Sequence, residues 1–275
     1  MNIKDRFFTF EKYKIYSEKY ETLNAKGVVI LIHGFRHYSG CLKEMAEFLY
    51  QEKYSVVLLD LIGHGKSSGE PRTWIDSINT HVNSVNFCIT EIQKENKDLP
   101  IFVIGHSMGG LVTSILARER KDLKGCVALA PAFYMKPHIM YFLSFLIVAI
   151  LFFAPLIMLP VPPNDKFFPD EESKRKMHND KYVWTDKLAL NTSFQLMKTG
   201  KEEVTKDITI PFLLLHGDSD MLVDVKGSQL KSKHLTNKHS KYVEFKNLNH
   251  ILYLEHNKLT QFKLIVDFLD DVLRK

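Results

Sequence analysis

Short apolar runs alternate along the chain with longer segments in which apolar residues recur at helical spacing. A nearly continuous apolar run is typical of a strand buried on both faces of a sheet. The runs that predict such strands are residues 27–33, 55–60, 101–106, 125–130 and 211–216, and a last strand is predicted over 242–245. Helical spacing predicts helices over 41–50, 78–92, 111–117 and 259–273. Strands and helices that alternate in this way predict a mostly parallel central sheet with helices on both faces.

The start of the chain predicts a different element. Residues 7–10 and 13–17 are two aromatic-rich stretches separated by a short turn, which favours a β-hairpin. In a parallel sheet, sites lie at the carboxyl ends of the strands. The residues that follow each predicted strand are therefore the candidates for chemistry.

Residues 105–109 read Gly-His-Ser-Met-Gly between the predicted strand over 101–106 and the predicted helix over 111–117. A Gly-x-Ser-x-Gly turn in this context is the sequence pattern of a nucleophile elbow. The two glycines allow close backbone approach, and the sharp turn exposes the serine hydroxyl above the sheet. We therefore predict that Ser107 is a nucleophile.

A serine nucleophile needs a base, and the base needs a carboxylate that orients it. The chain order expected here is Ser, then Asp, then His. For the base we choose His250, which follows the last predicted strand, whereas His256 is predicted to be a solvated surface residue. Two carboxylates, Asp218 and Asp220, compete in the loop after residues 211–216, and Asp220 is preferred because it lies farther into the loop.

Other strand-end residues receive supporting roles. The backbone N–H groups of Phe35 and Met108 are predicted to form the oxyanion hole that acyl transfer requires. His33 and His106 flank backbone turns and are predicted to pack there. Asp60 ends a strand but precedes the nucleophile, so we interpret it as structural.

These motifs resemble the monoacylglycerol lipase and lysophospholipase branch of the α/β-hydrolase superfamily. The matching segments are His33–Phe35 with Ser39–Gly40, Gly63–Ser67, Gly105–Gly110, Pro211–Asp220 and His250. The position of Asp220 also fits the family pattern. The resemblance implies an α/β-hydrolase fold with an inserted helical cap, serine hydrolysis of lipid esters and no cofactor. We predict no metal site.

The chain departs from the family at several head-group positions. Arg36 stands where the family usually has the second glycine of His-Gly-x-Gly, and His37-Tyr38 replaces Glu-His. Cys41 replaces an arginine, and Tyr253 replaces a second histidine. In monoacylglycerol lipases, polar residues here hold the glycerol head. Our hypothesis is that Arg36 instead contacts an anionic head group such as a lysophospholipid phosphate; the alternative is a solvated loop arginine.

Residues 139–159 are apolar except for Ser144 and Pro155. This run is long enough for a transmembrane helix. One crossing would separate Ser107 from Asp220 and His250 by about 30 Å of hydrocarbon, so we reject that interpretation. We predict instead a cap over 133–206, inserted between core segments 1–132 and 207–275, whose first helix extends to the prolines at 160–163. A second cap helix is predicted over 188–197, after a loop-like stretch at 166–187.

An apolar surface of this size is expected to lie on a membrane and to line an acyl-chain tunnel. The residues predicted to contact substrate there are Ile139, Phe142, Leu143 and Leu146. Burial of this helix against the core or against a second subunit is the alternative. The sequence does not determine the oligomeric state.

Composition adds mild constraints. The formal net charge is +5, but no long block of Lys and Arg residues occurs, which argues against a nucleic-acid partner. We interpret the positive charge as a preference of the protein for anionic membrane surfaces. Three widely spaced cysteines predict reduced thiols, and residues 1–14 contain no apolar core of signal-peptide length. We therefore expect a cytoplasmic, peripherally membrane-associated protein.

Together these patterns predict a serine hydrolase that cleaves carboxylic esters of single-chain lipids, either monoacylglycerols or lysophospholipids. The same triad could instead serve an acyltransferase, a thioesterase or a peptidase. A catalytically silent membrane-associated scaffold is the alternative from a different class.

Overall fold

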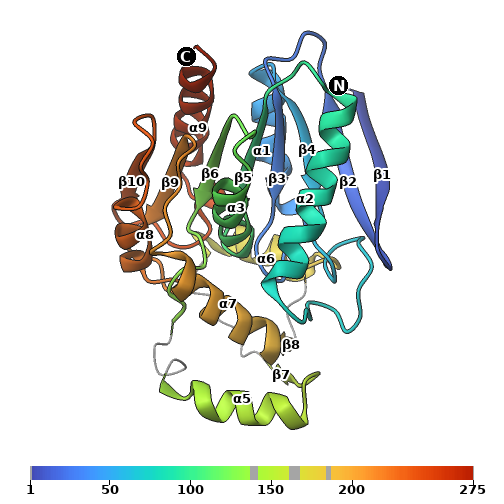
Figure 1. Ribbon diagram of the computed structural model, residues 1–275, viewed down its shortest axis with the longest axis vertical. Coiled ribbons are helices and arrows are strands. Elements are labelled where there is room, and N and C mark those ends of the chain that lie inside the picture. The colour runs from blue at the N-terminus through green and yellow to red at the C-terminus, as the bar shows by residue number, and fades with distance from the viewer. Residues whose placement is uncertain (1, 137–141, 161–167, 184–186, 275) are drawn as a thin grey trace.

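The computed structural model describes residues 2–136, 142–160, 168–183 and 187–274. Its main feature is an eight-stranded sheet in the order β1-β2-β4-β3-β5-β6-β9-β10 (Figure 1). The strands are β1 (Asn2–Phe10), β2 (Tyr13–Glu21), β3 (Val28–Ile32), β4 (Ser55–Leu59), β5 (Ile101–His106), β6 (Gly125–Leu129), β9 (Phe212–Gly217) and β10 (Lys241–Phe245). The predicted hairpin is present as β1 and β2, and β2 pairs antiparallel with β4. The strands from β4 to β10 are parallel, as predicted.

Helices cover both faces of the sheet because each strand contributes apolar side chains alternately to the two sides. The helices around it are α1 (Lys43–Gln51), α2 (Ile78–Glu95), α3 (Met108–Glu119), α8 (Val225–Ser232) and α9 (Lys258–Leu273). Val28, Ile30 and Ile32 of β3 pack in one core cluster with α2 and α3. Val29 and Leu31 pack in the other cluster, with α1 and α9. The two faces of the sheet therefore carry separate hydrophobic cores.

The segment between β6 and β9 contains the elements predicted as a cap. They are α5 (Ser144–Phe153), β7 (Met158–Pro160), α6 (Glu171–Asn179), β8 (Lys187–Ala189) and α7 (Leu190–Glu203). Figure 1 shows α7 and the β7–β8 pair beyond one end of the main sheet, with α5 outermost. We call residues 133–206 the cap segment.

The helix predicted across the long apolar run is much shorter in the structure. It ends at Phe153 rather than at the prolines after residue 159, and the run continues into β7, which pairs antiparallel with β8. The physical reason is Pro155, because a residue before proline is disfavoured in the helical region. Ala154 accordingly has φ −138° and ψ 69°. Among the described helices, none combines the length and apolarity needed to cross a bilayer.

The prediction of a loop over 166–187 was wrong, because this stretch contains α6. Its sequence lacks a long apolar stripe, but it carries clear capping signals. The Asp170 carboxylate accepts a hydrogen bond from the Ser173 N–H at 2.6 Å. Glu171 and Glu172 occupy the first turn, and Lys176 lies in the last, which complements the helix dipole.

Several hydrogen bonds attach the cap segment to a core loop. The indole N–H of Trp74 donates to the carbonyl oxygen of Pro155 at 2.8 Å, just after α5. Thr192 of α7 donates to the carbonyl oxygen of Thr73 and accepts from the N–H of Ile75, at 2.9 and 3.0 Å. The cap segment is therefore held by directional contacts as well as by packing.

The cysteines Cys41, Cys88 and Cys126 are free, as predicted. Burial raises the pKa of the Cys41 and Cys88 thiols to about 12. A thiol with such a pKa is protonated at neutral pH and is a poor nucleophile.

Candidate active site

Ser107 lies at the sharp turn between β5 and α3, with φ 54° and ψ −113°. This positive φ is unusual for a residue with a side chain. The turn requires glycine on both sides of the serine. A Cβ at Gly105 would lie 2.1 Å from the carbonyl oxygen of Gly109, and a Cβ at Gly109 would lie 2.4 Å from that of Ile32. The Gly-x-Ser-x-Gly pattern therefore has a direct steric cause here.

Ser107, His250 and Asp220 form a continuous chain of hydrogen bonds. The Nε2 atom of His250 is 2.9 Å from the Ser107 Oγ atom. The Nδ1 atom of His250 is 2.6 Å from the Asp220 Oδ2 atom. Because a carboxylate only accepts, Nδ1 carries the proton, and the neutral imidazole offers Nε2 to the serine hydroxyl. This arrangement allows His250 to remove the Ser107 proton.

The other two candidates for these roles lie elsewhere. The Asp218 side chain is exposed and accepts a hydrogen bond from the N–H of Asn247 at 2.7 Å, so it supports the turn rather than the triad. His256 is exposed. Asp220, in contrast, is only 2% exposed.

The Asp220 carboxylate is surrounded by donors. Its Oδ1 atom accepts from the backbone N–H groups of Leu222 and Val223 at 2.7 and 2.8 Å. Its Oδ2 atom is bound both by His250 and by the Nε2 atom of His216, which is 3.0 Å away. Burial acts to raise the pKa of Asp220, but the interactions with His250 and His216 outweigh it and hold that pKa well below its usual range. The carboxylate is therefore ionised at neutral pH.

The two predicted oxyanion donors border Ser107. Met108 is the first residue of α3, so its N–H has no partner within the helix and lies at the positive end of the helix dipole. On the other side is Gly34, where an added Cβ would lie 3.2 Å from the Ser107 Cβ. Phe35 follows directly after Gly34.

His33 orients the peptide that carries the Phe35 N–H. Its Nδ1 atom is 2.7 Å from the Gly34 carbonyl oxygen, and its Nε2 atom accepts from the N–H of Leu61 at 2.9 Å. The ring therefore donates from Nδ1 to Gly34. In a trans peptide the N–H points opposite to the carbonyl, so the Phe35 N–H points away from His33. The sequence predicted only packing for this histidine.

Two further residues have roles that depend on tertiary contacts. The Nε2 atom of His106 is 3.0 Å from the carbonyl oxygen of His250, and burial holds the pKa of His106 well below its usual range. A neutral His106 thus braces the backbone of His250. Asp60 accepts from the N–H groups of Ser39 and Lys66 at 2.6 and 2.7 Å, which supports its structural interpretation.

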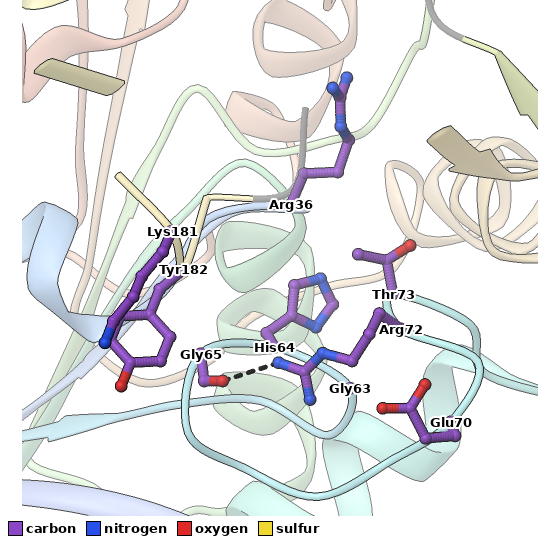
Figure 2. A pocket seen from close by; sticks show the side chains of 9 residues that line it. All are labelled: Arg36, Gly63, His64, Gly65, Glu70, Arg72, Thr73, Lys181 and Tyr182. Atoms are coloured by element: carbon purple, nitrogen blue, oxygen red, sulfur yellow. Dashed lines mark hydrogen bonds between the residues drawn. The ribbon is translucent and has the colours of Figure 1, made fainter. Parts of the chain in front are cut away.

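Arg36 lies at a separate pocket of about 300 Å³. The residues that line the pocket are Arg36, Gly63, His64, Gly65, Glu70, Arg72, Thr73, Lys181 and Tyr182. In Figure 2 the side chain of Arg36 extends away from those of His64 and Arg72. The Arg72 guanidinium is held by the carbonyl oxygens of Ser67 and Gly65, at 2.8 and 2.7 Å. Arg36 itself has φ 66°, a conformation that favours glycine.

The predicted acyl-chain contacts lie on the surface of the cap segment. Phe142 is 84% exposed and Leu146 is 55% exposed, while Leu143 is also on the exposed side. Ile139 lies outside the described residues. Burial of this surface against the core, one of the alternatives, does not occur for these three side chains. Within the described part of the chain, no cluster of potential metal ligands occurs.

Comparison with known proteins identifies relatives over most of the chain. A monoglyceride lipase of Mus musculus is 28% identical over 239 residues, which cover 86% of this chain and 78% of the relative. A phospholipase of Bacillus subtilis is 24% identical over 90% of this chain and 96% of its own.

Solved structures show the same fold. A monoacylglycerol lipase of Paleococcus ferrophilus matches with a TM-score of 0.82 and 24% identity, over 94% of this chain and 99% of its own. A soluble variant of Saccharomyces cerevisiae monoglyceride lipase, in complex with a substrate analogue, matches with a TM-score of 0.86 and 20% identity. The match covers 97% of this chain and 94% of the lipase chain. The sequence profile described as serine aminopeptidase, S33 matches residues 24–257. The chain therefore belongs to the serine aminopeptidase S33 family and has the α/β-hydrolase fold.

Proposed function

We propose that this protein hydrolyses carboxylic esters of single-chain lipids, monoacylglycerols or lysophospholipids, through a Ser107-His250-Asp220 triad. The observation that carries the proposal is the hydrogen-bonded chain from Ser107 through His250 to Asp220. The substrate class is supported by the relatives, which are named as monoglyceride lipases and a phospholipase.

Each step follows from the geometry around Ser107. His250 accepts the hydroxyl proton while the Ser107 oxygen attacks the ester carbonyl, and the N–H groups of Phe35 and Met108 stabilise the resulting oxyanion. The alcohol then leaves with the proton from His250, and an acyl-enzyme remains. Water, deprotonated by His250, releases the fatty acid. Each oxyanion donor typically contributes about 3–4 kcal/mol to transition-state stabilisation.

The family description favours a second candidate, a peptidase with the same triad. A panel of purified substrates separates the two candidates. It contains a monoacylglycerol, a lysophospholipid, an acyl thioester and an aminoacyl anilide, each assayed with and without an acceptor alcohol. Preferred release of fatty acid from the single-chain esters supports the proposal. Preferred anilide cleavage, or transfer of the acyl group to the alcohol, contradicts it.

We also propose that residues 133–206 act as a cap over a core formed by 1–132 and 207–275, and that α5 docks on a membrane. Helix α5 is apolar all round, yet most of its side chains are exposed. Its largest exposed side chains are Phe145, Leu146, Val148, Ile150, Phe152 and Phe153, and the exposed Phe142 lies just before its first residue. Such a surface is too apolar to be left in water. With its free cysteines, a cytoplasmic protein attached peripherally to a membrane fits these features.

Charging one face of α5 tests the docking. Phe145 and Phe152 are each 80% exposed and lie seven residues apart, so they share a face of the helix. Burying one phenylalanine side chain contributes about 1.5–3 kcal/mol, so the double variant Phe145→Asp/Phe152→Asp should lower vesicle binding by about 100-fold or more. Co-sedimentation with phospholipid vesicles measures the change.

The matched control is Leu23→Asp, which adds a charge at an equally exposed apolar residue, 90% exposed, in the turn after β2. Figure 1 shows that this turn lies at the opposite end of the sheet from α5. Both proteins should hydrolyse a short soluble ester at the wild-type rate. Undiminished vesicle binding by the α5 variant would exclude the docking, and a dimer that dissociates in this variant would assign the surface to a second subunit.

Arg36 is proposed to contact an anionic head group, since it lines a pocket with the further cations Arg72 and Lys181 and, among the described lining residues, a single carboxylate, Glu70. An exposed ion pair contributes up to about 1 kcal/mol, so Arg36→Ala should lower kcat/KM for an anionic lysophospholipid about fivefold. The rate on a neutral monoacylglycerol should not change. The control is Arg274→Ala, which also removes an arginine charge. Arg274 directly follows α9 and does not line the pocket. An unchanged ratio of the two rates in Arg36→Ala would leave this residue as a solvated loop arginine.

A further inference from the structure

A second histidine binds the carboxylate of the triad. His216 is the fifth residue of β9 and is fully buried. Its Nε2 atom is 3.0 Å from the Asp220 Oδ2 atom, the same oxygen that binds His250. Its Nδ1 atom is 2.6 Å from the Oγ atom of Ser228, a buried residue of α8. Hydrogen bonds therefore run without interruption from Ser228 through His216, Asp220 and His250 to Ser107.

The positions of the protons follow from the acceptors. Asp220 is ionised and can only accept, so His216 must carry its proton on Nε2. With the proton on Nε2, the Nδ1 atom can accept a hydrogen bond from the Ser228 hydroxyl group. A hydrogen bond from Ser228 thus complements the tautomer of His216 that donates to Asp220. The position of Ser228 on a separate helix also fixes the plane of the ring.

We propose that His216, held by Ser228, is a positioning residue of the triad that fixes the Asp220 carboxylate and limits how strongly it attracts the His250 N–H. The inference rests on the proposed function. Oδ1 is held by two backbone N–H groups and Oδ2 by two histidines, so the carboxylate cannot rotate away from His250. The Oδ2 atom shares its negative charge between the two imidazoles.

This sharing has a measurable consequence. Without the His216 N–H, Asp220 Oδ2 keeps one side-chain donor, and the charge on it acts on His250 alone. The protonated form of His250 is then stabilised, so its pKa rises. Since His250 must be neutral to accept the Ser107 proton, the acidic limb of the pH profile of kcat/KM moves to higher pH. A loss of packing alone would lower kcat and leave this limb in place.

Other titratable or charged groups surround the two histidines and remain unchanged in the test. His106 contacts the His250 ring from the end of β5, and the Lys136 ammonium donates to the Asp220 carbonyl oxygen at 2.7 Å. Within the described part of the chain, further titratable groups nearby are His37 and Tyr253 beside His106, Asp224 at the start of α8, and Glu244 beside His216 on β10.

The experiment compares four variants on a short p-nitrophenyl ester across pH. His216→Leu removes both nitrogen atoms, His216→Gln restores an N–H donor, and Ser228→Ala removes only the hydroxyl group. His81→Leu is the matched control, because His81 is another fully buried histidine, on α2, and its ring nitrogens have no hydrogen-bond partner among the described residues. Thermal melting shows how far each variant is destabilised.

We expect His216→Leu to raise the acidic-limb pKa by about one unit and to lower kcat about tenfold. His216→Gln should recover most of both effects, and Ser228→Ala should show a smaller shift in the same direction. His81→Leu should leave the limb in place. An unshifted limb in folded His216→Leu overturns the proposal. If His216→Leu does not fold, an unshifted limb in Ser228→Ala overturns it instead.

Failure of this inference is distinct from failure of the proposed function. If Ser107→Ala is inactive while the acidic limb of the kcat/KM profile stays at the wild-type pH in the His216 variants, only the positioning role is wrong. If Ser107→Ala keeps full activity, the triad itself is wrong.

Discussion

Replacing Ser107 with alanine is expected to lower kcat for lipid ester hydrolysis by about 10⁶-fold. The alanine cannot form the acyl-enzyme, and His250 then has no hydroxyl group to deprotonate at 2.9 Å. The two backbone N–H groups of the oxyanion hole remain, so a small residual rate over water is expected. Release of fatty acid from a monoacylglycerol and a lysophospholipid measures the loss.

Labelling with a fluorophosphonate probe provides a second readout, since the probe reacts with an activated serine. The wild-type protein should be labelled at Ser107, and Ser107→Ala should not be labelled. Ser232→Ala removes a hydroxyl group that bonds within α8 and is the control, with wild-type labelling and turnover expected. An unlabelled wild-type protein would favour a silent scaffold, whereas a labelled Ser107→Ala would place the nucleophile elsewhere.

The largest effect on stability is expected from Glu203→Gln, at the end of α7 where the cap segment returns to the core. Glu203 and Lys231 are both buried, and their charged groups are 3.1 Å apart. The Lys231 ammonium also donates to the carbonyl oxygens of Glu203 and Lys206, and Arg118 approaches the carboxylate at 3.4 Å. Removing one partner of a buried ion pair typically costs about 3–5 kcal/mol, because the other charge remains buried.

Urea unfolding of the wild-type protein and Glu203→Gln measures this loss of free energy. The double variant Glu203→Gln/Lys231→Met removes both charges and should recover much of it, since an uncharged pair leaves no isolated buried charge. Glu171→Gln neutralises an exposed carboxylate of α6 and is the control. If the double variant is less stable than Glu203→Gln, the pair is held by packing rather than by charge.

Local patterns in the sequence were enough to predict the sheet and the elbow. Strand β3 is apolar at every position, and β5 over its first four residues, because both faces of the sheet are covered. The elbow is equally local, because the steric clashes at Gly105 and Gly109 arise within the turn and from the neighbouring strand. The cap segment was harder to predict. Helix α6 depends on end capping rather than on an apolar stripe, and α5 ends where a single proline interrupts an otherwise uniform run.

The sequence by itself determined the fold class, the buried strands and the selection of Ser107, Asp220 and His250 as candidates. Each of these follows from residue type, spacing or chain order, which a linear pattern contains. Only the tertiary structure decided that Asp220 also binds His216, that His33 orients the Phe35 peptide, and that the side chains of α5 face outward. These features depend on how separate segments pack. The contact between His216 and Ser228, for example, exists because α8 lies against β9, and no local pattern in either segment specifies it.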